Sequence, residues 1–190
     1  MKPKILKEIE LHLKLVEDFK NSEIDKIIEI SKAIVSSLKS GGSIYLCGNG
    51  GSAADAQHIA GELMGKFRLN SKPFPAISLS TDTSVMTCIG NDYSFDNIFS
   101  RQVRALIKKN DLLWVFTTSG KSQNIIKACK EAKNCGGKVI AFTGRTETNF
   151  KEIADLIFKV DSEITSTVQE MHQLGYHIIC GIVERELTQE

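Results

Sequence analysis

Two stretches of the sequence carry side chains that can bind a metal ion or transfer protons. His58 and Glu62 are four residues apart, a spacing that puts both side chains on one face of a helix. Near the end of the chain, His177 lies close to Gln169 and Glu170. An imidazole beside a carboxylate can exchange protons with a substrate or bind zinc. A lone His–Glu pair at this spacing is also common as a surface interaction, so the pattern leaves both interpretations open.

Helical spacing alone does not gather the residues of the last helix around one ion. Glu170 and His177 are seven residues apart and share a helix face. Gln169 and His177 are eight apart, which separates them by about 80° around the helix axis and about 12 Å along it. They could bind the same metal only if both side chains leaned inward, or if Gln169 lay outside the regular helix.

A glycine-rich loop, Gly48–Ser52, connects a predicted strand to a helix that begins near Ala53. Its glycines let backbone N–H groups approach a ligand closely, and the start of the helix favours an anion. The same pattern also occurs in tight turns that bind nothing. Gly48, Gly50 and Ala53 fit a dinucleotide-binding motif, but that motif expects an acidic residue about 20 positions later. Asp82 comes too late for that role, so the dinucleotide interpretation is the weaker one.

A second polar loop follows the third predicted strand and reads Thr117-Thr118-Ser119-Gly120-Lys121-Ser122. Hydroxyls, a glycine and a lysine at a helix start are typical of a phosphate site, although a Ser/Thr-rich turn has the same composition. The loop is not a nucleotide-binding P-loop, because Val115 occupies the position of the first glycine. The sequence therefore favours a sugar phosphate or similar small phosphate over ATP. A third segment, Gly90–Asp92, is on its own most typical of a plain turn.

The elements that must position these loops follow a regular order. Residues 1–40 carry two amphipathic helical patterns, with a break at Asn21-Ser22 and an end at Gly41-Gly42. Short apolar runs then alternate with helical patterns such as Gln123–Lys133, and a last helix spans about 167–187. Runs that are apolar on both faces are typical of buried parallel strands. The sequence thus predicts an α/β fold with a doubly wound, five-stranded parallel sheet. The predicted strands are Ser43–Cys47, Ala76–Ser80, Leu112–Phe116, Lys138–Phe142 and Leu156–Val160.

Composition excludes several classes of function. The chain has 190 residues, which suits one domain. It holds 24 Lys and Arg against 23 Asp and Glu, and the net charge of +1 gives no footprint for a nucleic acid. No apolar run approaches the roughly 20 residues of a membrane helix, and the N-terminus shows no signal-peptide pattern. Five cysteines without a C-x-x-C pair argue against disulfides and a thiolate zinc site. We therefore expect a cytoplasmic protein that binds neither nucleic acids nor membranes.

Taken together and in this order, several segments resemble the sugar isomerase (SIS) domain family, and within it the phosphoheptose isomerases. The resemblance covers nearly the whole chain and implies a single SIS domain over 1–190, with a flavodoxin-like α/β core at 41–190. Each segment alone is modest evidence, but their combination is specific. The segments that carry it are Cys47–Ser52, Asp55–Leu63, Gly90–Asp92, Phe99–Arg101, Thr117–Ser122, Gln169–His172 and His177.

This resemblance implies one zinc ion per subunit, bound by His58, Glu62, Gln169 and His177. The family's arrangement thus pairs Gln169 with His177, which helical spacing does not. One departure is Lys121, which stands where relatives have a neutral Asn and either strengthens phosphate binding or projects into solvent. The resemblance also implies the substrate contacts, which are Asn49, Gly50, Gly51, Ser52, Glu62, Asn91, Asp92, Thr117, Thr118, Ser119, Ser122 and Gln169.

The function implied by the resemblance is an aldose–ketose isomerisation. It converts sedoheptulose 7-phosphate to D-glycero-D-manno-heptose 7-phosphate, the first step of ADP- or GDP-heptose precursor synthesis for lipopolysaccharide or capsule. Moving a carbonyl from C2 to C1 needs a base that shuttles a proton through an enediol. Glu62 is the candidate base and His177 the candidate acid. The resemblance further implies a homotetramer, with residues 1–40 in the interfaces and sites shared between subunits.

Two other functions fit parts of the sequence. A non-catalytic SIS module that binds a replication initiator protein would keep the sheet and the phosphate loop, but would not need the proton-handling side chains. All of those side chains are present here, which favours the enzyme. An isomerase of another phosphosugar also fits, because the loops indicate a phosphate and do not measure the length of the sugar.

Overall fold

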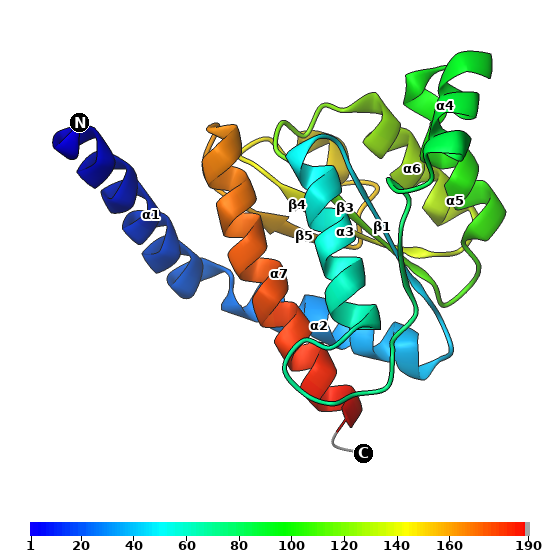
Figure 1. The fold of residues 1–190 in the computed structure, drawn as a ribbon, viewed down its shortest axis with the longest axis horizontal. Helices are drawn as coiled ribbons and strands as arrows, with labels where there is room; N and C mark the ends of the chain where they lie inside the picture. The colour runs from blue at the N-terminus through cyan, green and yellow to red at the C-terminus, as the bar shows by residue number, and fades with distance from the viewer. Residues whose placement is uncertain (189–190) are drawn as a thin grey trace.

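The structure is a computed structural model that describes residues 1–188. Five parallel strands form one sheet in the order β2-β1-β3-β4-β5, with helices on both faces (Figure 1). This is the flavodoxin-like, doubly wound arrangement that the sequence predicts. Each predicted strand is confirmed, with its ends within two residues of the expected ones. The strands are β1 (Ile44–Gly48), β2 (Ala76–Ser78), β3 (Leu112–Thr117), β4 (Lys138–Thr143) and β5 (Leu156–Lys159).

The helices form two layers around the sheet. One face is covered by α2 (Ile24–Lys39), α3 (Gly51–Met64) and α7 (Thr165–Thr188), and α3 lies beside α7 (Figure 1). The other face is covered by α4 (Thr83–Asp92), α5 (Ser100–Leu106) and α6 (Gln123–Asn134), with the short 3₁₀ turns η1 (Phe95–Asn97) and η2 (Thr148–Phe150). Helices α3 and α7 run side by side along the sheet, and together they carry the side chains of the candidate site.

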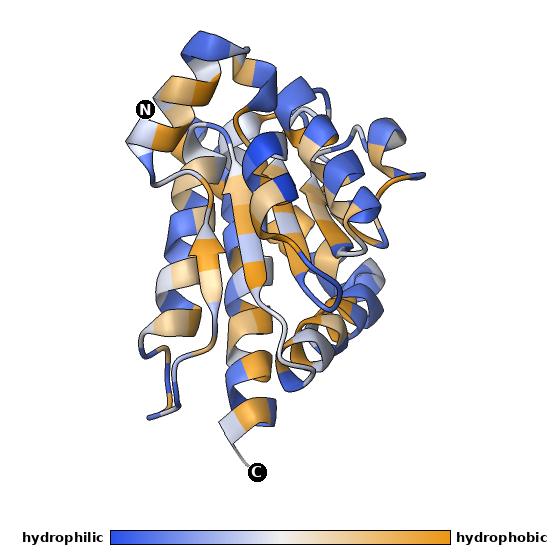
Figure 2. Cartoon of the chain, turned by 90° about the vertical axis from the view of Figure 1, so that its right-hand side faces the viewer, coloured by the Kyte–Doolittle hydropathy of each residue, from blue (hydrophilic) through white to orange (hydrophobic). Residues whose placement is uncertain are grey.

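Two hydrophobic cores lie on opposite faces of the sheet, because successive strand residues point to opposite sides. Leu46 and Trp114 pack toward α2, α3 and α7, whereas Cys47 and Val115 pack toward α5 and α6. Hydrophobic residues, drawn in orange, accordingly lie along the strands in Figure 2. This alternation explains why each strand reads as a continuous apolar run. All of the cysteines are free, and Cys88 is the exposed one among them.

Helix α4 differs from the sequence expectation. Gly90–Asp92 form its last turn, not the plain turn that their composition favours. Asp82 caps the helix by accepting a 2.9 Å hydrogen bond from the N–H of Val85, and Ile89 is buried against the neighbouring core. Capping and tertiary packing therefore override the low helix propensity of Gly, Asn and Asp.

The first helix, α1 (Lys2–Ser22), extends from the body of the molecule (Figure 1). Leu15 is its one buried residue, while a row of apolar side chains faces outward. His12 contacts Glu170 of α7 and so ties the middle of this helix to the core. Among residues 1–188, no helix combines the length and apolarity needed to cross a bilayer. The outward apolar side chains are Ile5, Leu6, Ile9, Leu13 and Val16.

Candidate active site

Two loops meet at the carboxyl ends of β1 and β3, where the direction of winding reverses. The chain leaves β1 toward α3 and leaves β3 toward α6, which lies on the other face of the sheet. Such a reversal opens a crevice that binds ligands in folds of this kind. The crevice here is a pocket that contains both predicted phosphate loops. It is lined by Asn49, Gly50, Gly51, Ser52, Phe116, Thr117, Thr118, Ser119, Ser122, Thr165 and Gln169.

Three helices begin at this pocket. Helix α3 starts at Gly51, α6 starts just after Ser122, and α7 starts at Thr165. The N-terminus of a helix carries unpaired N–H groups and a partial positive charge, so three of them favour an anion. All the lining residues are uncharged, so an anion in this pocket would be held by backbone N–H groups and hydroxyls.

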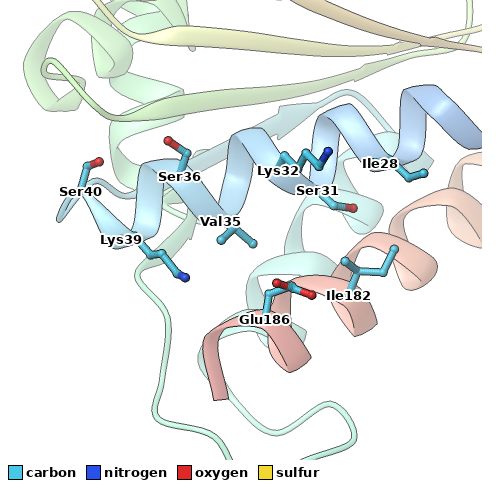
Figure 3. Close-up of a pocket in the computed structure, with 9 residues that line it drawn as sticks. All are labelled: Ile28, Ser31, Lys32, Val35, Ser36, Lys39, Ser40, Ile182 and Glu186. Atoms are coloured by element: carbon cyan, nitrogen blue, oxygen red, sulfur yellow. The ribbon is translucent and has the colours of Figure 1, made fainter. Parts of the chain in front are cut away.

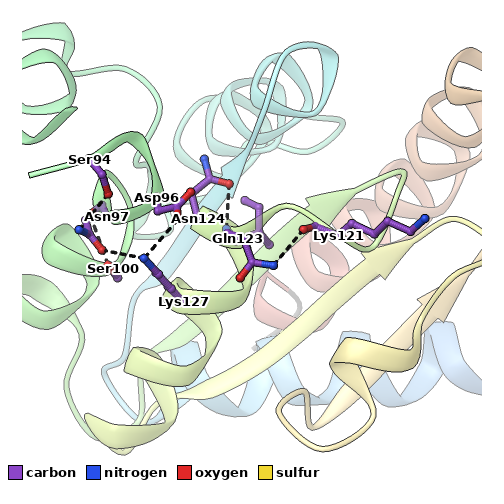
Figure 4. Close-up of polar contacts among 9 residues, drawn as sticks. Ser94, Asp96, Asn97, Ser100, Lys121, Gln123, Asn124 and Lys127 are labelled. Carbon is purple, nitrogen blue, oxygen red and sulfur yellow. Dashed lines mark hydrogen bonds and ion pairs between the residues drawn. The ribbon is translucent and has the colours of Figure 1, made fainter. Parts of the chain in front are cut away.

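Lys121 does not belong to this pocket. Its side chain is exposed and extends away from Gln123 and Asn124 (Figure 4). Its backbone carbonyl accepts a 3.4 Å hydrogen bond from the Gln123 amide. Of the two alternatives that the sequence left open, the structure favours projection into solvent.

The two loops are held against each other and against α7. The side-chain amides of Asn49 and Asn124 exchange hydrogen bonds of 2.9 and 2.8 Å, which join the first loop to α6. Gly51 has no Cβ, and the amide of Gln169 occupies the space that a Cβ would fill. Gln169 therefore reaches the pocket from α7, at the level of the first residue of α3.

We expect Gly48→Ala to destabilise the fold, because an added Cβ would collide with the backbone carbonyl of Ser52. Backbone cannot move aside as a side chain can, so overpacking should cost about 1–3 kcal/mol. Gly61→Ala, in α3, is the control, since nothing lies within 4 Å of the Cβ position of Gly61. Urea unfolding of both variants checks this, and an equally stable Gly48→Ala protein would contradict the close approach.

His58, Glu62 and His177 form one cluster, although His177 comes from a different helix. The Nε2 atom of His58 is 2.9 Å from Oε1 of Glu62 and 3.5 Å from Nε2 of His177. One ligand atom from each residue can be chosen so that all three lie within 4.8 Å of one another. Two imidazole nitrogens and one carboxylate oxygen at these separations are a donor set that suits zinc.

The surroundings of His177 favour its neutral form and fix the orientation of its ring. Burial lowers its pKa, and the neighbouring His58 lowers it further. Its ring stacks on Phe67, with ring centroids 5.8 Å apart and planes inclined by 10°. The segment that carries Phe67 is anchored by the buried carboxylate of Glu184, which accepts hydrogen bonds from the N–H groups of Arg68 and Leu69. A neutral, oriented imidazole is the form that binds a metal or accepts a proton.

The remaining predicted metal ligand, Gln169, and two predicted substrate contacts, Asn91 and Asp92, need separate description. Gln169 is within the regular part of α7, so the alternative that places it outside the helix is wrong. Its role as a fourth metal ligand stays a prediction. Asn91 and Asp92 end α4, where the Asn91 amide donates a 2.9 Å hydrogen bond to Asp92. They do not line the pocket, and their contact with substrate also stays a prediction.

We expect the buried His172 to make stability depend on pH. Its Nε2–H donates to the carbonyl of Thr143 at 3.1 Å, and burial lowers its pKa to about 4. The unfolded chain binds a proton near pH 6.5, so stability is full above that pH and is lost as pH falls toward 4. Between pH 7 and pH 5, His172 should cost about 2 kcal/mol.

Comparing the free energy of unfolding of the parent and of His172→Gln at pH 7 and pH 5 isolates this effect. Gln keeps a donor for Thr143 and removes the titration. Asp55, whose pKa burial raises to about 6, acts in the opposite direction in both proteins. An equal loss of stability in the two proteins would show that His172 does not carry the pH dependence.

Several residues at the site are not predicted from the sequence. Phe116 and Thr165 line the pocket, and Asn124 orients Asn49. Asp55 and Tyr176 lie next to His58, and their proximity joins α3 to α7. The one signal for this pair is position, since Asp55 precedes His58 by a helical turn and Tyr176 adjoins His177 in the sequence.

Comparison with known proteins shows the family to which this chain belongs. The SIS domain family model matches residues 9–144. The phosphoheptose isomerase of Aliarcobacter butzleri is 45% identical over 188 residues, which are 99% of this chain and 100% of that protein. The phosphoheptose isomerase structure from Neisseria gonorrhoeae has a TM-score of 0.91 at 35% identity, covering 97% of this chain and 98% of its own. That from Francisella tularensis has a TM-score of 0.93 at 36% identity, covering 96% and 97%. The chain therefore belongs to the SIS domain family, among its phosphoheptose isomerases.

Proposed function

We propose that the protein converts sedoheptulose 7-phosphate to D-glycero-D-manno-heptose 7-phosphate. The observation that carries this proposal is the separation between an anion pocket and an acid–base cluster on the same pair of helices. The pocket lies at the start of α3 and α7, and the cluster lies farther along both. A sugar phosphate bound with its phosphate in the pocket would extend toward the cluster.

The length of this separation suits a heptose. His58 follows Gly51 by seven residues, which is about 10 Å along the helix axis. His177 follows Gln169 by eight, about 12 Å. An extended chain advances about 1.2 Å per bond, so C1 of a heptose 7-phosphate lies about 10 Å from phosphorus, eight bonds away. The reacting carbons would thus reach the level of His58, Glu62 and His177.

The side chains of the cluster fit the proton transfers of the reaction. The Glu62 carboxylate takes a proton from C1 of the ketose, which gives an enediol, and returns it to C2, which gives the aldose. The hydroxyl proton must also move from O1 to O2, and we assign this transfer to His177. Binding of the distant phosphate orients the sugar carbons for both transfers.

We propose that His58, Glu62 and His177 hold one zinc ion per subunit. Gln169 is the further ligand that the family resemblance implies, and to reach this ion its side chain would have to leave its place beside Gly51. When bound, zinc would polarise the sugar carbonyl and stabilise the negative charge that develops on the enediol oxygens. Glu62 need not give up its role as a base. A carboxylate has two oxygens, so one can face the metal while the other takes the substrate proton.

We propose a homotetramer with shared sites, and exposed apolar surfaces support association between subunits. The outward row on α1, which includes Ile9 and Leu13, would be covered by another subunit. A groove between α2 and α7, lined in part by Ile28, Val35 and Ile182, is a second such surface (Figure 3). We propose that residues 1–40 form the interfaces and that residues 1–190 work as one SIS domain.

The proposed reaction supplies heptose phosphate for the synthesis of lipopolysaccharide or capsule in the cytoplasm. The presence of the complete His58–Glu62–His177 cluster supports an enzyme over a binding module for a replication initiator protein. A module of that kind would have no need of a proton-handling cluster.

The test is to incubate the purified protein with sedoheptulose 7-phosphate and to follow the aldose heptose 7-phosphate by NMR, with and without a chelator. We expect turnover that the chelator abolishes and zinc restores. If the protein still turns over with the chelator present and elemental analysis shows that it is metal-free, the proposed role of zinc is refuted and the proposed reaction stands. No turnover with zinc present would refute the substrate, and other phosphosugars and protein partners would be examined next.

A further inference from the structure

The hydroxyl of Tyr176 lies between His58 and a buried carboxylate. Tyr176 is fully buried on the inner side of α7. Its oxygen is 3.0 Å from Nδ1 of His58 and 3.4 Å from Oδ1 of Asp55, which is one turn before His58 on α3. The second oxygen of Asp55, Oδ2, is buried and has no hydrogen-bond partner within residues 1–188. The row Asp55–Tyr176–His58 therefore lies behind the imidazole, on the ring edge opposite Glu62 and His177.

The single proton of the Tyr176 hydroxyl allows two arrangements of this row. In the first, Tyr176 donates to Nδ1 of His58, and His58 carries its own proton on Nε2, which then donates to Glu62. In the second, Tyr176 donates to the Asp55 carboxylate, and Nδ1–H of His58 donates to the tyrosine oxygen. Only the second leaves the lone pair of Nε2 free to bind a metal ion.

The Asp55 carboxylate favours the second arrangement. An ionised carboxylate only accepts hydrogen bonds, and a bond to it is stronger than one to a neutral nitrogen. Asp55 has Tyr176 as its side-chain donor here, and its other oxygen is left without one. A buried carboxylate with too few donors is costly, so a hydrogen bond from the Tyr176 hydroxyl to Asp55 is favoured. The tyrosine oxygen then remains as the acceptor for Nδ1–H of His58.

We propose that Tyr176 is a positioning residue that, together with Asp55, sets the His58 tautomer that binds the metal through Nε2. This inference rests on the proposed metal site of His58, Glu62 and His177. Tyr176 would not touch the metal or the substrate. Its hydroxyl would act through His58 alone, by fixing both the orientation of the ring and the nitrogen that carries the proton.

The test is the zinc affinity of Tyr176→Phe, measured by competition with a chromophoric chelator on metal-free protein. Phe preserves the buried ring and removes only the hydroxyl, and we expect zinc to bind about 10–100-fold more weakly. Tyr45→Phe is the matched control, because its hydroxyl donates to the carbonyl of Leu106, remote from His58. We expect its affinity to stay within twofold of the parent.

The proposal is overturned if Tyr176→Phe binds zinc within twofold of the parent, or if Tyr45→Phe weakens binding equally. Should Tyr176→Phe fail to fold by circular dichroism, Asp55→Ala takes its place, because it removes the acceptor and leaves the tyrosine ring in position. Unchanged zinc affinity in that variant overturns the proposal. A parent protein that binds no zinc refutes the metal site itself, so this outcome is distinct from a failure of the tyrosine alone.

Discussion

Glu62→Gln is expected to fold like the parent and to lose nearly all turnover. Gln has the size and shape of Glu but cannot accept a proton from C1 of the sugar. Loss of a general base lowers kcat by about 10²–10⁴-fold. The side chain is on α3, half-buried beside His58, and the Gln amide can hydrogen-bond to Nε2 of His58 in either tautomer, through its oxygen or through its NH₂ group. The fold and the distant phosphate pocket should therefore be unaffected.

The measurement is kcat by NMR with sedoheptulose 7-phosphate at saturating zinc, together with thermal unfolding. Saturating zinc separates the loss of the base from a loss of metal. Glu152→Gln is the matched control, because Glu152 is exposed in the turn before β5 and should leave kcat unchanged. A kcat within tenfold of the parent would remove Glu62 from the role of base.

His177→Ala is expected to lose both zinc and turnover. His177 is the only member of the cluster that comes from α7, and its Nε2 lies 3.5 Å from that of His58. Without His177, two of the three metal-binding side chains of the cluster remain, His58 and Glu62, and both are on α3. Since the loss of a partner that only orients a ligand already costs 10–100-fold in affinity, the loss of the ligand itself should cost more than about 100-fold.

Elemental analysis after dialysis and kcat at limiting and excess zinc check this expectation. His12→Ala is the control for zinc bound by a histidine outside the cluster, because His12 lies on α1 and contacts Glu170. We expect His12→Ala to retain zinc and His177→Ala to be purified without it. Undiminished zinc in His177→Ala would exclude this residue from the ligand set.

The hydrophobic pattern alone determined the sheet and the placement of its loops. A buried parallel strand must be apolar on both faces, so runs such as Leu112–Thr117 stand out without any tertiary information. The residues after each strand then fall at the carboxyl edge of the sheet. For that reason the loops Asn49–Ser52 and Thr117–Ser122 could be predicted as neighbours, and they line one pocket. The pairing of His58 with Glu62 is likewise local, because a spacing of four residues fixes it on any helix.

Only the tertiary structure decided which distant residues meet. His177 is 119 residues from His58, and nothing in the spacing of α7 selects it over Glu170. The packing of α3 beside α7 turns His177 toward the cluster, Glu170 toward α1 and Gln169 toward Gly51. The same packing brings the Tyr176 hydroxyl between Asp55 and His58. Helix periodicity fixes the face on which a residue lies, but the register between two helices depends on how their side chains interlock. That interlocking involves both helices at once, which is why one stretch of sequence cannot reveal it.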